Sequence, residues 1–168
     1  MGFIEVITKL FGNKSQKDMR AVMPYVEKIK AVYAEIDALS DDELRARSAA
    51  LMQCLQDAVA THKTKIQELK TSIENIDIDK REKVYNEIDR LEKEVLDIYD
   101  KTLNDILPEA FAVVKSTARR FAHNETITVL ATQMDRDLAA DPRFDFVEID
   151  GDKAIYHNSW TAGGNEVI

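Results

Sequence analysis

The sequence contains one cysteine, Cys54, among its 168 residues. An intramolecular disulfide is therefore excluded, and the composition fits a reducing cytoplasm. Long apolar runs are also absent, since none approaches the ~20 residues that a membrane-spanning helix needs. The N-terminus is not expected to be a signal peptide, because Glu5 and Lys9 interrupt its apolar stretch and no small-residue cleavage site follows.

Glycine, proline and aromatic residues are scarce. The chain has five glycines, three prolines and 7% aromatic residues, whereas 32% of its residues are charged. This balance is typical of long solvated helices rather than of a compact enzyme. The net charge of −8 is uneven, since residues 1–30 carry six Lys and Arg against three Asp and Glu, and residues 31–106 carry eleven against eighteen. An acidic body argues against nucleic-acid binding.

Motifs of catalytic and nucleotide-binding sites are missing as well. The sequence has no GxxxxGK[ST] loop, no GxGxxG and no GxSxG. Its three histidines, His62, His123 and His157, fall on three different expected elements, and no cluster has the spacing of a metal site. The residues by themselves therefore predict no active site and no bound metal.

Amphipathic helices are what the sequence does contain. Residues 1–12 place six large apolar side chains on one side and predict a short helix, which packs either on its own protein or on a membrane or partner surface. A second helix is expected over residues 15–39, with a kink or a start at Pro24. Ser40 and Glu43 then form a capping-box pattern that begins a third helix.

Two longer stretches repeat their apolar positions at heptad spacing and predict an antiparallel helical hairpin over residues 40–106. The break between them is the NIDID sequence at residues 75–79, and His62 is expected at the edge of the hairpin core. The first stretch has its expected core positions at 44, 48, 51, 55, 58, 62, 66, 69, 73 and 76, and the second at 84, 88, 91, 95, 98, 102 and 106.

The sequence LPEAFAVVKSTARRF, residues 107–121, differs from what precedes it. Pro108 is expected to interrupt the helix, and Ala110 to Val114 are apolar without a break. A helix that is apolar on nearly all sides needs to be buried. A separate buried helix is therefore predicted over residues 107–122.

The last part of the chain changes its period to that of strands. Residues 125–132 alternate and are rich in β-branched side chains, and Asp150-Gly151 separates two more alternating runs at 144–149 and 153–157. A short helix, QMDRDLAA, is expected after the first strand, and TAGGNEVI at the end is read as loop or the start of a further strand. The predicted fold class is mainly α, a long antiparallel helical hairpin with a small antiparallel three-stranded β-sheet near the C-terminus.

Three segments in this order resemble the N-terminal region of the SecA family, the ATPase motors of bacterial protein export. They are ITKLFGNKSQKDMR, IDALSDDELRARSAAL and LPEAFAVVKSTARR, and the close resemblance covers residues 1–56 and 103–121. In the common form of the family a short loop replaces 57–102, which is therefore an inserted hairpin here. The chain divides into residues 1–39, 40–106, 107–122 and a β element at 123–168 that leads toward a nucleotide-binding domain.

The resemblance implies the rest of the functional expectation. The family's adenine-contacting glutamine motif and phosphate-binding loop lie outside these residues, so ATP and Mg belong to a longer protein and this chain is expected to be inactive alone. Family members are cytoplasmic and associate peripherally with the inner membrane. They work with the SecY channel complex, acidic phospholipids and preproteins. Whether the protein forms a homodimer is left open by the sequence. The implied membrane and channel attachment residues are Phe3, Ile7, Lys9, Leu10, Phe11, Lys14, Lys17 and Arg20. Those implied to pack onto the nucleotide-binding domain are Phe111, Val113, Val114 and Phe121.

A different class of protein is the alternative. A free-standing coiled-coil adaptor with no enzymatic role explains the high charge, the heptads and the missing catalytic motifs. It does not explain why three segments match the SecA family in order.

Overall fold

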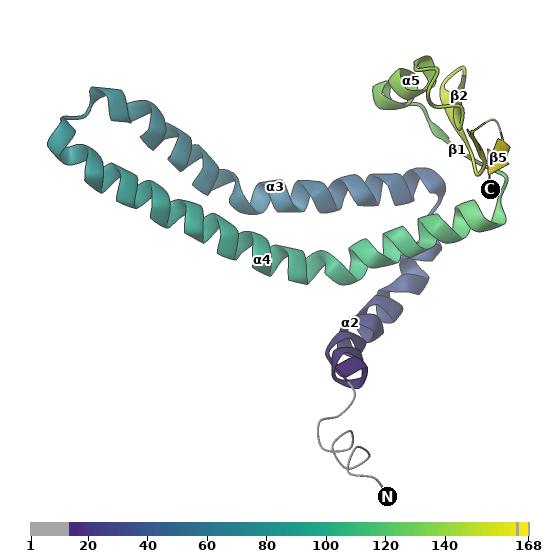
Figure 1. The fold of residues 1–168 in the computed structure, drawn as a ribbon, viewed down its shortest axis with the longest axis horizontal. Coiled ribbons are helices and arrows are strands. Elements are labelled where there is room, and N and C mark those ends of the chain that lie inside the picture. Colours follow the sequence, from purple (N-terminus) through teal and green to yellow (C-terminus); the bar gives the residue numbers. More distant parts are fainter. Residues whose placement is uncertain (1–13, 164, 168) are drawn as a thin grey trace, which may run out of the picture.

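The computed structural model describes residues 14–163 and 165–167 of the chain (Figure 1). The segment expected to form the first helix lies outside the described residues, together with its attachment residues Phe3, Ile7, Lys9, Leu10 and Phe11. A long helical hairpin dominates the described part, with one helix crossing its base and a small sheet beside that base. Within the described residues, no helix combines the length and the apolar character that crossing a bilayer requires.

Helix α2, Lys14–Asp37, is the helix that crosses the base of the hairpin. It runs through Pro24 without ending, so the alternative that the helix begins at this proline is wrong. Its C-terminal half packs on the hairpin through Ile29, Tyr33 and the buried Ile36. Tertiary packing of this amphipathic face supports the whole helix.

Helix α3, Asp41–Ser72, forms the first arm of the hairpin. The predicted capping box is confirmed: the Ser40 side chain accepts from the Glu43 amide at 3.3 Å, and the Ser40 amide donates to the Glu43 carboxylate at 2.8 Å. These two bonds satisfy backbone donors that a helix N-terminus leaves open. At 32 residues, the arm is about 48 Å long.

The second arm is α4, Ile78–His123, which follows the 3₁₀ turn η1, Ile73–Asn75. The hairpin is confirmed, and its core consists of Val59, Ile66, Ile88, Leu91 and Val95. Two expected core positions, 48 and 58, are wrong, because both are exposed. Position 58 is exposed and Val59 is buried instead, because burying valine removes more apolar surface from water than burying alanine does.

Pro108 does not interrupt α4. The helix continues through it to His123, so the expected separate helix at 107–122 is instead the C-terminal part of α4. Figure 1 shows α4 changing direction in its C-terminal half, as an internal proline favours. Burial of Ala112 and Val113 against Ile36 and Leu44, one turn beyond the proline, stabilises the continuing helix.

The three-stranded sheet is confirmed. Its strands are β1, Thr126–Leu130, β2, Val147–Asp150, and β3, Lys153–His157, in the antiparallel order β1-β3-β2. The expected helix QMDRDLAA is α5, Gln133–Ala140. Gly151 has φ 61° in the β2–β3 turn, a left-handed conformation that glycine adopts without strain.

The end of the chain adds a second, two-stranded sheet of β4, Trp160–Ala162, and β5, Asn165–Val167. The sequence predicted a loop here, or the start of a further strand. Phe121 at the end of α4 packs on the buried face of the larger sheet, beside Ile127, Val129 and Ala154. The sheet is therefore fixed to the same end of the hairpin that α2 crosses.

Candidate functional site

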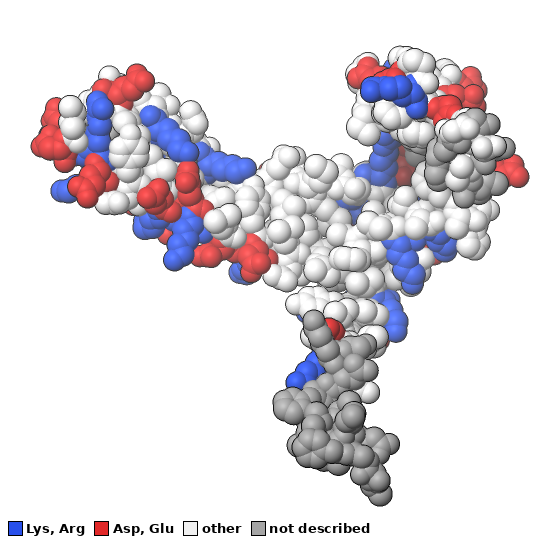
Figure 2. Space-filling model, viewed as in Figure 1, with Lys and Arg blue, Asp and Glu red and all other residues white. Residues whose placement is uncertain are grey.

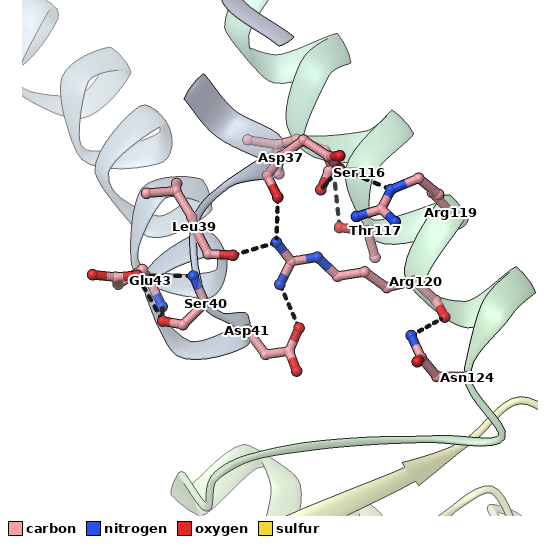
Figure 3. Close-up of polar contacts among 11 residues, drawn as sticks. Asp37, Leu39, Ser40, Asp41, Glu43, Ser116, Thr117, Arg119, Arg120 and Asn124 are labelled. Carbon is pink, nitrogen blue, oxygen red and sulfur yellow. Dashed lines mark hydrogen bonds and ion pairs between the residues drawn. The ribbon is translucent and has the colours of Figure 1, made fainter. Parts of the chain in front are cut away.

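Polar side chains of the described residues gather where the α2–α3 connection meets the C-terminal end of α4 and the sheet. We name this cluster the polar junction; its members are Asp37, Asp41, Arg45, Ser116, Arg119, Arg120, Asp135 and Tyr156. Figure 3 shows the part around Arg120. Within the described residues, the polar junction included, no three His, Cys, Asp or Glu side chains lie close enough to hold a metal ion.

Arg120 is the centre of the polar junction. It is only 8% exposed, and its guanidinium donates to the Asp41 carboxylate and to the backbone carbonyls of Leu39, at 2.5 Å, and Asp37, at 3.5 Å (Figure 3). Carbonyls at the end of a helix have no partner within that helix. Arg120 of α4 therefore provides hydrogen bonds to carbonyls at and just after the end of α2, and it is paired with Asp41, the first residue of α3.

Asp37 connects α2 to α4 by a second set of bonds. Its carboxylate accepts from the Ser116 hydroxyl at 2.8 Å and from Arg119 Nε at 3.0 Å. The hydrogen bond from Ser116 is the largest cause that holds the pKa of Asp37 below its usual value, and Arg119 acts in the same direction. Asp37 is therefore a fixed anion at neutral pH.

Asp135 is a fully buried carboxylate that connects the sheet region to α3. It accepts from Arg45 at 2.5 Å, from the Tyr156 hydroxyl, and from the Thr132 amide and hydroxyl at 2.7 and 2.8 Å. Burial raises the pKa of this carboxyl, but the hydrogen bonds outweigh burial and hold the pKa well below its ordinary value. Burial, followed by the bond to Asp135, raises the pKa of Tyr156 to about 12.

The outer edge of β1 is also joined to α3. Arg45 donates to the Leu130 carbonyl at 3.3 Å, and the Leu130 amide donates to the Asp42 carboxylate at 2.9 Å. The side chains of Asp42 and Arg45, in the first turns of α3, thus bond backbone groups of β1 that a neighbouring strand would otherwise bond. The sheet is held on the helices by specific polar bonds as well as by Phe121.

A cavity of about 310 Å³ lies beside the polar junction. Most of its wall is apolar, with Leu44, Val113, Phe121, Ile127 and Val129 among its residues. The cationic groups at its edge, Arg45 and Arg120, are already paired with Asp135 and Asp41. These two ion pairs join the helices and the sheet. Because both arginines are paired, neither is free to bind a phosphate at this cavity.

A second hollow is an apolar groove of about 390 Å³ between α3 and α4. Phe111 and Val114 line it and are 56% and 66% exposed. Val113, the third of the four residues implied to pack onto the nucleotide-binding domain, is buried against Ile36 and Leu44 of this chain. Phe121, the fourth, is half-buried against the sheet.

Those of the predicted attachment residues that the structure describes lie on the first turns of α2. Lys17 and Arg20 are exposed there, and α2 begins at Lys14. Their exposed apolar neighbours are Met19, Val22, Met23 and Tyr25. The structure therefore places two basic side chains beside an apolar surface at the end of α2 that projects from the hairpin (Figure 1).

Comparison with known proteins gives two kinds of match. A family model described as the SecA DEAD-like domain matches residues 7–134. Proteins named protein translocase subunit SecA are similar to this chain: that of Porphyromonas gingivalis is 55% identical over 168 residues, that of Parabacteroides distasonis 54% over 167, and that of Christiangramia forsetii 41% over 169. The matches cover 100%, 99% and 99% of this chain, which spans only 15% of each relative. No solved structure matches it.

Proposed function

The chain belongs to the SecA family, and from this membership we propose that it is the N-terminal part of a protein translocase subunit. The whole subunit would use ATP hydrolysis, with Mg, to drive unfolded preproteins through the SecY channel. The observation that carries the proposal is identity of 55% along the entire chain with one such subunit. An adaptor that shared only a coiled-coil hairpin would not match over the α2–α3 connection and the sheet as well.

Within that subunit, the role proposed for these residues is scaffolding rather than chemistry. The ionisable groups of the polar junction pair with one another and fix the relative positions of α2, the base of the hairpin and the sheet. Nucleotide chemistry needs backbone amides and a lysine that cradle phosphates, together with carboxylates on Mg. Those groups are proposed to lie in the rest of the subunit.

Calorimetric titration with ATP and Mg tests this division of labour. We expect no binding to the 168-residue chain at micromolar concentrations, because it lacks a phosphate-binding loop. The full-length subunit should bind ATP and hydrolyse it, and addition of a preprotein and SecY-containing vesicles should give transport. Micromolar binding to the isolated chain, or a full-length protein without ATPase activity, would contradict the proposal.

Attachment to the cytoplasmic face of the inner membrane is the second proposed role, through residues 1–20 acting on acidic phospholipid and the SecY complex. Six large apolar side chains lie in residues 1–12, whereas residues 1–20 carry four Lys and Arg against two Asp and Glu. Burying one large apolar side chain contributes roughly 1.5–3 kcal/mol, and one basic side chain near an anionic surface about 1 kcal/mol. Apolar insertion should therefore dominate.

Paired substitutions in the full-length subunit separate the two contributions. Phe3→Ala with Phe11→Ala should weaken co-sedimentation with acidic vesicles more than Lys9→Ala with Lys14→Ala does. The difference should persist at physiological salt, where charges more than about 8 Å apart are screened. A larger loss from the lysine pair, or binding that collapses with modest salt, would show that attachment is electrostatic.

A further inference from the structure

We draw no further inference here: the strongest candidate, the outward face of α4 near the tip of the hairpin, where Ile78 and Tyr85 are 81% and 51% exposed among the Lys, Arg, Asp and Glu side chains that crowd the tip (Figure 2), carries nothing, since no feature of the described residues shows what covers it.

Discussion

Arg120→Ala is expected to lower the free energy of unfolding of the 168-residue chain by about 2–4 kcal/mol, the range for removing one partner of a buried, hydrogen-bonded ion pair that keeps some solvent access. The side chain bonds the Asp41 carboxylate and two carbonyls at the end of α2. Its removal leaves these acceptors without partners next to a cavity that already exists. Helix α2 and the start of α3 should loosen together.

Arg119→Ala is the matched control, one residue earlier in the same helix. Arg119 is exposed and its ion pair with Asp37 lies at the surface, so its loss should change stability far less. Arg120→Lys should recover only part of the loss, since an ammonium group cannot reach three acceptors with the planar geometry of a guanidinium. Urea unfolding followed by circular dichroism gives all three values. Equal effects of the two alanine substitutions would show that the polar junction adds little to stability.

Local signals explain which parts of the fold could be predicted. The capping box at Ser40, the heptad spacing of the hairpin and the turn at Gly151 each lie within a few residues of sequence, and each appears in the structure as expected. The short helix α5 also appears where it was expected, and the structure shows that Thr132 caps it.

Long-range packing explains what the sequence did not show. Pro108 predicts a break by local rules, but burial of Ala112 and Val113 on α2 and α3 carries the helix past it. The contact between Arg45 and Asp135 joins residues 90 positions apart in the sequence, and no local sequence pattern predicts it. A signal did exist for Asp135, since Thr132-x-x-Asp135 is a capping-box spacing, but that pattern gives no hint of the arginine and tyrosine it also bonds.

Long-range packing also separates the four residues that the resemblance implied to pack onto the nucleotide-binding domain. The sequence treated Phe111, Val113, Val114 and Phe121 as one set because they share an apolar run. The structure divides them, with two exposed, Val113 buried in the helices and Phe121 on the sheet. What separates them is the direction in which each side chain leaves α4. The angular position of a residue around the helix therefore predicts its burial, whereas the apolar content of the segment does not.

Asp135→Asn is expected to destabilise the sheet region by about 3–5 kcal/mol, the cost of breaking a buried ion pair by changing one partner. The carboxylate accepts from Arg45, Tyr156 and Thr132, and an amide would oppose one of these donors with its own N–H groups. Hydrogen exchange of the β1 and β3 amides should follow unfolding of the sheet region, while far-ultraviolet circular dichroism follows the helices. Asp137→Asn, in the same helix at an exposed position, is the control and should leave both transitions in place.

The effect of Asp135→Asn should also depend on pH. Because the folded pKa of Asp135 lies well below its unfolded value, the carboxylate stabilises the fold fully above about pH 4 and loses this contribution as pH falls toward the folded pKa. Tyr156 has the opposite sign: its pKa is raised to about 12, so its contribution is complete below about pH 10 and is lost between there and about pH 12. The stability difference between wild type and Asp135→Asn should therefore be constant from about pH 5 to pH 9 and shrink between about pH 4 and pH 2. A difference that stays constant into acid would mean that the charge of Asp135 does not stabilise the contact, and that shape alone joins the sheet to α3.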